Sequence, residues 1–396
     1  MSEDPKGERG RRVCMLLLHD LLSPLDPRVY KEAKALIEAG YEVSVVCWSR
    51  RNPASTDRET FEGIDVRRVV LDPGPVDASI LHKYRVFKKV RASMEKVAIS
   101  LRPDIVHAHD LETLPIGSRV KRRLGIPLVF DAHEDWPALE ARHSRVMGIL
   151  TRILQRWHIG SADRILTINE GVARRLRGAR CPITILYNSR PYDKASSKVS
   201  DVTRERVGLA PGQFVLGYLG RIDRDLGYEI AIEAMKRLGD ERVRLLVVGG
   251  PEEEKKHYQE MAARLGVSGS CIFTGQVPYG SVNGYLSLMD VGLTLMESND
   301  LYDIALGNRF FDYIGAGVPL ITTDLPVMRQ VVERIGCGIV LKERGIEALV
   351  ASIKELMDHP DARARYRENA LNAFKEEFCW ERQRDRLIEV YKDLGK

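Results

Sequence analysis

The sequence predicts an α/β protein made of two Rossmann-like, doubly wound domains that face each other across a cleft. The chain has 396 residues, enough for two domains at roughly 150 residues each. In both halves short β-branched runs alternate with amphipathic stretches, and this alternation indicates parallel sheets covered by helices. The halves also differ in charge. Residues 1–195 carry 34 basic and 25 acidic side chains, whereas the remainder carries 27 and 31.

The first half contains seven strand candidates, separated by helical patterns. A helix is expected at Val29–Ala39, where apolar residues recur at helical spacing and Gly40 supplies a stop. The strands are expected at Arg12–Leu18, Glu42–Cys47, Asp65–Val70, Asp104–His107, Leu128–Phe130, Arg164–Ile168 and Ile183–Leu186.

The second half repeats the pattern after a polar segment at 191–212, which is the expected linker. Its strands are expected at Phe214–Leu219, Val243–Val248, Cys271–Thr274, Val291–Leu295 and Leu320–Thr322, with helices at 226–237, 254–265, 307–315 and 324–333. Residues 1–192 are therefore assigned to an N-terminal domain and 193–376 to a C-terminal domain. A last helical segment, 377–396, follows the C-terminal domain.

Several classes of protein are disfavoured. No apolar run approaches the roughly 18 residues of a membrane-spanning helix. The six cysteines are scattered without a C-x-x-C pair, which argues against structural zinc or a disulfide framework and predicts a cytoplasmic location. The first strand is followed by no G-x-G-x-x-G and no P-loop occurs, so a dehydrogenase and an ATPase are disfavoured. Basic residues are not interleaved with stacking aromatics, so no nucleic acid is expected as a partner.

Two strands of the first half end in histidine-bearing sequences, PDIVHAHD (103–110) and VFDAHED (129–135). His107 continues its strand and is interpreted as a core residue. The residues at the strand exits could hold sugar hydroxyls or share protons near neutral pH; they are His109, Asp110, His133 and Glu134. The same four residues could in principle bind a metal, but no pair has the i, i+4 spacing of a helical metal site, so no metal is expected.

The second half offers an anion site after its first strand, in GYLGRID (217–223). Gly220 permits a tight turn, Arg221 projects from it, and a helix is expected to begin near Leu226. Amides at a helix start together with a guanidinium suit a diphosphate, although Arg221 could also merely cap a surface turn.

A second motif, GNRFFDYIGAGVPL (307–320), complements this turn. Asn308 and Arg309 are expected to precede a short helix that carries Asp312 in its first turn. A carboxylate there could accept the two ribose hydroxyls of a nucleotide, although favourable interaction with the helix dipole would also explain an acid.

These stretches, with SPLDPRVYKEAKALIEAGYEV (23–43), SADRILTINEGVARRL (161–176), LLVVGG (245–250) and IFTG (272–275), resemble the retaining GT-B-type glycosyltransferases of family four over nearly the whole chain. The resemblance implies a nucleotide-sugar donor, UDP- or GDP-linked, in the C-terminal domain and an acceptor in the N-terminal one. It also implies that the last helical segment, 377–396, crosses back to the first domain. Arg221 would bind the diphosphate, Asp312 the ribose and His133 the transferred sugar, which makes His133 and Arg221 the expected catalytic residues. Donor contacts are further expected from Gly220, Arg224, Glu297, Asn308 and Arg309.

The chain departs from the family pattern at two positions. Leu226 stands where the family often has a second cation, so that Arg224 or Arg309 would have to compensate. Ile304 stands where a first acidic residue is expected, and it cannot hydrogen-bond a sugar hydroxyl. The sequence Asn308–Asp312 is similar to the Asn-Lys-x-x-Glu-like loop of one subgroup.

Two basic amphipathic segments, 82–102 and 142–157, carry seven and four Lys or Arg against one and no acid. They suit an anionic membrane surface, and equally an ordinary core-facing helix with a solvated basic side. The first reading predicts a peripheral enzyme at the inner face of the membrane.

The expected activity is therefore metal-independent, cofactor-free sugar transfer with retention to a glycan or lipid-linked acceptor. The alternatives are a sugar-nucleotide epimerase and a non-catalytic subunit that only binds a nucleotide sugar.

Overall fold

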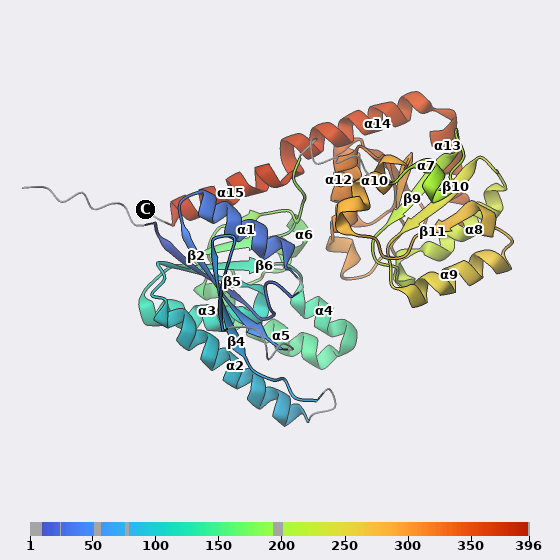
Figure 1. The fold of residues 1–396 in the computed structure, drawn as a ribbon. Helices are drawn as coiled ribbons and strands as arrows, with labels where there is room; N and C mark the ends of the chain where they lie inside the picture. The colour runs from blue at the N-terminus through green and yellow to red at the C-terminus, as the bar shows by residue number, and fades with distance from the viewer. Residues whose placement is uncertain (1–9, 24, 51–56, 76–78, 193–200, 395–396) are drawn as a thin grey trace, which may run out of the picture. The chain divides into compact units, whose positions relative to one another are not determined.

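A computed structural model describes residues 10–23, 25–50, 57–75, 79–192 and 201–394. The chain divides into two compact units (Figure 1). Unit 1 consists of Met1–Tyr187 together with Arg384–Lys396, and unit 2 consists of Asn188–Gln383. The boundaries between the units lie at Tyr187 and Gln383, whereas the boundaries expected from the sequence were residues 192 and 376. The last helix, α15 (Trp380–Asp393), therefore begins in unit 2 and ends in unit 1.

Unit 1 contains an eight-stranded sheet in the order β3-β4-β2-β1-β5-β6-β7-β8. Among the strands that the structure describes in this unit, only β3 is antiparallel to its neighbour. It was not expected from the sequence, because the turn that joins it to β4 is built from Glu62 and Gly63, both with positive φ, rather than from an Asn-Gly pair. The strands are β1 (Arg12–Leu17), β2 (Glu42–Ser49), β3 (Arg58–Phe61), β4 (Ile64–Val70), β5 (Ile105–His109), β6 (Leu128–Ala132), β7 (Arg164–Thr167) and β8 (Ile183–Ile185).

The helices of unit 1 cover both faces of this sheet, with α1 and α15 on one side and α2 and α3 on the other (Figure 1). They are α1 (Pro27–Glu38), α2 (Ile80–Ser100), α3 (Asp110–Leu124), α4 (Trp136–His143), α5 (Arg145–His158) and α6 (Glu170–Arg175). Helix α1 starts two residues before the expected Val29, since Pro27 is tolerated in the first turn and the Asp26 carboxylate accepts hydrogen bonds from two backbone amides there.

Unit 2 contains a six-stranded, entirely parallel sheet in the order β11-β10-β9-β12-β13-β14. The first five strands in chain order match the expected ones to within one residue, whereas β14 was not expected. The strands are β9 (Phe214–Leu219), β10 (Val243–Val248), β11 (Cys271–Phe273), β12 (Val291–Thr294), β13 (Leu320–Thr323) and β14 (Gly338–Leu341).

Helices connect the strands of unit 2, and further helices follow its last strand. They are α7 (Arg204–Val207), α8 (Tyr228–Leu238), α9 (Glu252–Arg264), α10 (Val282–Ser287), α11 (Asn308–Ala316), α12 (Pro326–Ile335), α13 (Ile346–Asp358) and α14 (Pro360–Ala373). Part of the expected linker, 193–200, lies outside the described residues, and α7 occupies a later part of it.

The order of the strands places one topological switch in each sheet. In unit 1 the strand order reverses at β1 and β5, and in unit 2 it reverses at β9 and β12. Every residue of β5, β6, β9, β12 and β13 is buried, as expected for parallel strands covered on both faces. The doubly wound α/β class predicted for each half is thus confirmed. No helix in the described ranges combines the length and apolarity needed to cross a membrane.

Candidate functional site

A pocket of about 300 Å³ lies in unit 2 at the switch between β9 and β12. Ligands of open α/β sheets bind at such a point, outside the carboxyl ends of the strands. Leu219 is the last residue of β9 and Thr294 the last of β12. The lining residues are Leu219, Gly220, Arg221, Leu226, Thr294, Met296, Gly307, Asn308, Arg309, Phe310, Asp312 and Met328. Five of the seven residues expected to contact the donor are among them.

The turn after β9 forms one wall. Gly220 has a φ of 107°, a conformation that side chains with a Cβ rarely adopt. The Arg221 side chain is 80% exposed, and its nearest acidic partner is Asp223, with 3.6 Å between Nη2 and Oδ2. A guanidinium held this loosely remains available to an anion that enters the pocket.

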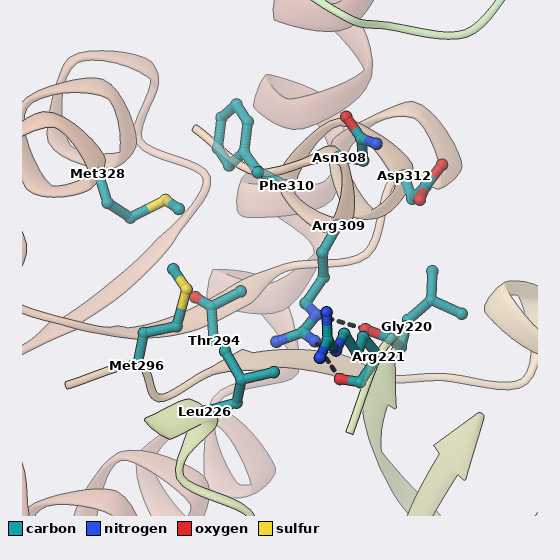
Figure 2. A pocket seen from close by; sticks show the side chains of 12 residues that line it. Gly220, Arg221, Leu226, Thr294, Met296, Asn308, Arg309, Phe310, Asp312 and Met328 are labelled. Atoms are coloured by element: carbon teal, nitrogen blue, oxygen red, sulfur yellow. Dashed lines mark hydrogen bonds between the residues drawn. The ribbon is translucent and has the colours of Figure 1, made fainter. Parts of the chain in front are cut away.

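Arg309 fixes this turn (Figure 2). Its Nε donates to the carbonyl of Leu219 and its Nη2 to the carbonyl of Arg221, at 3.3 Å in the second case. The guanidinium also stacks over the Tyr218 ring, with the carbon 4.5 Å from the ring centroid. Arg309 therefore shapes the anion site as well as lining it, a role that the sequence did not reveal.

The amino end of α11 forms the opposite wall, and here the sequence expectation was wrong in one respect. Asn308 and Arg309 are the first two residues of α11 rather than residues before it, since Gly307 is the N-cap. No side chain in the described part of the chain caps this end. The Phe310 amide donates to the Gly307 carbonyl at 2.9 Å, and the two residues before it line the pocket, where the positive end of the helix dipole favours an anion.

Because α11 begins at Asn308, Asp312 lies in its second turn and not in the first. Figure 2 shows Asp312 on α11 beside Asn308. Its Oδ1 lies 3.9 Å from Nε of Arg190, which also donates from Nη2 to the Asp312 carbonyl at 3.2 Å. The carboxylate is thus oriented by a cation of the same unit and still lines the pocket.

Some of the remaining residues that the sequence analysis singled out on the donor side line the pocket, and others do not. Leu226 does line the pocket and is buried, and Tyr218 donates a hydrogen bond to its carbonyl. The expected helix does not begin there; a 3₁₀ turn, Arg224–Leu226, comes first and α8 begins at Tyr228. Glu297 and Ile304 are not among the lining residues, and the side chain of Arg224 lies outside the described part of the structure.

Part of the pocket was missed by sequence reasoning. Met296 and Met328 give it an apolar wall, together with Phe310. Met296 stands two residues beyond β12, so its position after a strand at the switch was a usable signal. Met328 lies on α12, and no comparable feature of the sequence points to it.

Unit 1 holds a cluster of buried charges at the carboxyl ends of β5 and β6. Arg28 binds the Asp131 carboxylate with two hydrogen bonds, at 2.9 Å from Nε and 2.8 Å from Nη2. Glu32, one turn later on α1, lies 3.1 Å from the same Nε. Burial would raise the pKa of Asp131, but the Arg28 and His133 charges outweigh it and hold that pKa well below its usual range. Burial and the neighbouring Asp131 raise the pKa of Glu32 to about 8.

His133 connects this cluster to Asp110. Its Nε2 lies 2.9 Å from Asp131 Oδ2 and its Nδ1 3.3 Å from Asp110 Oδ2. Burial alone would lower the pKa of His133, yet the carboxylates of Asp110 and Asp131 raise it to about 9. The ring is therefore an imidazolium at neutral pH, with Nε2 donating to Asp131 and Nδ1 in an ion pair with Asp110.

The other expected residues of unit 1 differ in accessibility. His107 is completely buried, as interpreted from the sequence, with its Nδ1 2.8 Å from the Tyr391 hydroxyl. His109 is completely buried too, and its Nδ1 lies 3.2 Å from His133 Nε2. His109 is consequently not placed to contact an acceptor directly, because its strand end is covered. Glu134 is exposed, and Asp110 is partly exposed.

A different set of residues from the one considered in the sequence could supply metal ligands. Atoms of Glu32, His107, His109 and Asp131 lie within 4.8 Å of one another. The Arg28 guanidinium already contacts both carboxylates, and the raised pKa of Glu32 favours its protonated form. These features fit a buried charge network better than a metal centre, where the acids must be ionised.

Both halves of the chain match models of known protein families. A family model described as Glycosyltransferase Family 4 matches residues 28–191, and one described as Glycosyl transferases group 1 matches residues 199–373. The chain is 24% identical over 393 residues to glycogen synthase of Mycobacterium tuberculosis, covering 94% of this chain and 91% of that protein. It is 23% identical over 421 residues to D-inositol 3-phosphate glycosyltransferase of Acidothermus cellulolyticus, covering 97% and 90%.

Solved structures show the same fold. Sucrose-phosphate synthase from Thermosynechococcus elongatus has a TM-score of 0.75 at 15% identity and covers 97% of this chain and 99% of its own. HepE of Anabaena, in complex with UDP-glucose, has a TM-score of 0.67 at 15% identity and covers 96% and 99%. At these identities the likeness establishes the architecture alone.

Proposed function

Because this chain belongs to the GT-B-type glycosyltransferases of family 4 and group 1, we propose that it moves a sugar from a nucleotide-sugar donor held in the pocket of unit 2. The observation that carries the proposal is the geometry at the β9–β12 switch. There Arg221, the uncapped start of α11 and Asp312 line one pocket. A cation and free amides suit a diphosphate, and a carboxylate beside them suits the two hydroxyls of a ribose.

Solved structures with the same fold support a nucleotide donor. HepE of Anabaena has been seen with UDP-glucose, and trehalose-6-phosphate synthase with UDP-2-fluoro glucose is another structural neighbour. We propose a UDP- or GDP-sugar for this chain. The apolar wall of Met296, Phe310 and Met328 offers dispersion contacts to the uncharged parts of such a ligand.

The proposed reaction is a front-side substitution with retention. As the bond between the anomeric carbon and the phosphate oxygen lengthens, negative charge grows on the departing nucleoside diphosphate. Arg221 and the α11 amides would stabilise that charge more strongly than the charge of the bound donor, which lowers the barrier. In this proposal protein groups neutralise the phosphates, so the reaction runs without a metal and without a covalent sugar intermediate on a carboxylate pair.

The acceptor is proposed to bind unit 1. Asp110 and Glu134 present carboxylates at the ends of β5 and β6, where they could accept hydrogen bonds from sugar hydroxyls. The partly buried His133 imidazolium, paired with Asp110 and Asp131, would keep Asp110 in place and offer positive charge to a bound sugar. A glycan or a lipid-linked glycan is the acceptor class that fits.

Turnover measurements test the donor site. Arg221→Ala and Asp312→Ala should each lower kcat/KM by about 10²-fold or more, the usual effect of removing one group that stabilises transition-state charge. Arg237→Ala removes an exposed arginine of α8 that is paired with Glu347 outside the pocket, and it should leave turnover unchanged. Near wild-type rates for both pocket variants would contradict the assignment.

The need for an acceptor separates the alternatives. A transferase consumes donor rapidly only when acceptor is present, an epimerase converts donor alone, and a non-catalytic subunit binds donor without converting it. The proposal expects the first behaviour, measured by following donor and free nucleoside diphosphate with and without a panel of glycans.

A further inference from the structure

Helix α5 presents its apolar face to solvent rather than to the core. Six of the nine large apolar side chains that are exposed in the described part of the chain belong to it; they are Val146, Met147, Ile149, Leu150, Ile153 and Trp157. Trp157 is 78% exposed and Val146 65%. An ordinary amphipathic helix of a globular protein has the opposite orientation.

The inward face of α5 explains how the helix is held. Its buried residues are Gly148 and Gln155. A Cβ on Gly148 would lie 2.7 Å from Ala141 Cβ and 2.9 Å from the Pro137 carbonyl oxygen of α4. Helix α5 thus packs closely on α4 through its small residue, and this packing leaves the bulky side chains on the outer surface.

The charges of α5 are of one sign. Arg145, Arg152 and Arg156 are exposed, and the helix contains no acidic residue. Burial, together with the positive charges of Arg119, Arg91 and Arg122 on α3 and α2, lowers the pKa of His158 at the end of α5, although Arg119 is itself paired with Glu95 of α2.

Helix α2 provides an internal comparison. Its sequence also has a basic amphipathic pattern, but Val90, Met94 and Ala98 are buried. Its apolar face is therefore part of the core of unit 1, and only its basic side is solvated. Of the two segments that the sequence marked as basic and amphipathic, α5 alone leaves an apolar face uncovered.

We propose that α5 docks on an anionic phospholipid bilayer, with the face from Val146 to Trp157 inserted at the headgroup level and its arginines paired with lipid phosphates. Tryptophan and aliphatic residues on one face with only basic charges beside them are the properties of interfacial helices. A second copy of the chain fits less well, since two such helices would bring arginines of the same sign together. The docking uses unit 1 residues outside the pocket and does not depend on the proposed reaction.

Vesicle flotation tests this proposal. The full chain should float with vesicles of phosphatidylcholine and phosphatidylglycerol and float far less with phosphatidylcholine alone. Ile153→Ser with Trp157→Ser should lower the partition coefficient by roughly tenfold or more, given the apolar area withdrawn from the bilayer. Arg152→Glu with Arg156→Glu should produce a similar loss that added salt mimics in the wild type.

Two matched controls keep the test specific. Val70→Ser changes an exposed apolar residue of β4, and Lys256→Glu reverses an exposed basic residue of α9; both should float like the wild type. Thermal stabilisation by UDP or GDP, measured on each variant, reports the unit 2 pocket separately. Equal flotation of all variants, absence of flotation, or a stable dimer that the Ile153→Ser/Trp157→Ser change abolishes would each overturn the proposal.

Discussion

At the residue scale, His133 is a histidine whose ionisation is set by two carboxylates. Its pKa is raised to about 9, against roughly 6.5 in an unfolded chain. A raised pKa means that the imidazolium stabilises the fold fully below about pH 6.5 and that this contribution is lost as the pH rises through 9. The wild type should therefore lose up to about 3 kcal/mol of unfolding free energy relative to His133→Gln across that interval.

Urea unfolding of both proteins between pH 6 and pH 9.5 measures this difference. Using the variant as reference removes the contributions of the buried cysteines, whose pKa values do not depend on His133. The His133 charge also lowers the pKa of Glu32, so the measured difference includes that coupled titration. A difference that stays constant over the interval would show that His133 is neutral in the folded protein.

Arg309 is the second residue whose role the structure defines, since it joins the turn after β9 to α11. Arg309→Ala leaves the carbonyls of Leu219 and Arg221 without this donor, and we expect about tenfold weaker binding of a nucleoside diphosphate and a lower Tm. Arg309→Lys keeps the charge but cannot bond both carbonyls in the same geometry, so its affinity should be intermediate.

Calorimetric titration and thermal unfolding measure the two effects. Arg329→Ala breaks an exposed ion pair between Arg329 of α12 and Asp324, which precedes that helix. It is the matched control and should change neither quantity. If Arg309→Ala bound nucleotide as tightly as the wild type, the turn would not depend on this side chain.

At the scale of single elements, the start of α8 depends on Gly227. Its φ is 81°, and a Cβ would lie 2.3 Å from the carbonyl oxygen of Leu295. Gly239, at the end of the same helix, has a φ of 57° but open space around it, with the nearest atom at 4.0 Å. Gly239→Ala should cost about 1 kcal/mol through its backbone alone, and Gly227→Ala at least about 3 kcal/mol because a clash is added.

Denaturant unfolding of the two alanine variants provides the comparison. Equal destabilisation by the two changes would mean that the loop carrying Leu295 moves aside without cost.

The sequence predicted most elements because hydrophobic period and strand-to-helix alternation report directly on burial in a parallel sheet. All five strands expected in unit 2 are present, and β1 and β2 begin where expected. The prediction missed β14 although β12 and β13 are equally short; β14 is an edge strand, and three of its four residues are only partly buried. The helix expected at 307–315 starts within one residue of α11, but the interpretation of the motif placed Asn308 and Arg309 before the helix, because neither residue has a strong preference for or against a helix.

The candidate site was predictable to a similar degree. Residues that follow a strand at the switch, such as Gly220 and Arg221, could be found from order and spacing. The burial of these residues could not be predicted from the sequence in the same way. His109 and His133 both occur at the end of a strand, yet the His109 side chain is completely buried. The spacing of apolar residues along α5 also does not show which face of the helix points outward, because that depends on the packing of Gly148 against α4.

At the scale of the whole molecule, the end of the chain completes unit 1. Tyr391 of α15 is completely buried, and its hydroxyl lies 2.8 Å from His107 Nδ1, although 284 positions separate the two residues. Tyr391→Phe leaves a buried ring nitrogen without its partner and should cost about 1–3 kcal/mol. Tyr84→Phe, at an exposed tyrosine of the same unit, should change the stability by less than about 0.5 kcal/mol.

Tryptophan fluorescence during urea unfolding suits this measurement, because Trp48, Trp136 and Trp157 all belong to unit 1. An unchanged midpoint for Tyr391→Phe would contradict a stabilising role for the hydroxyl, whereas a loss in both variants would point to a general effect of removing tyrosine hydroxyls.

The central claim concerns the whole enzyme: a nucleoside diphosphate binds at the β9–β12 switch of unit 2. A crystal structure of the chain with UDP or GDP tests it most directly. We expect the diphosphate within hydrogen-bond distance of Arg221 and the first amides of α11, and the ribose hydroxyls on Asp312. A nucleotide bound elsewhere, or a pocket that stays closed to both nucleotides at saturating concentration, would contradict the account.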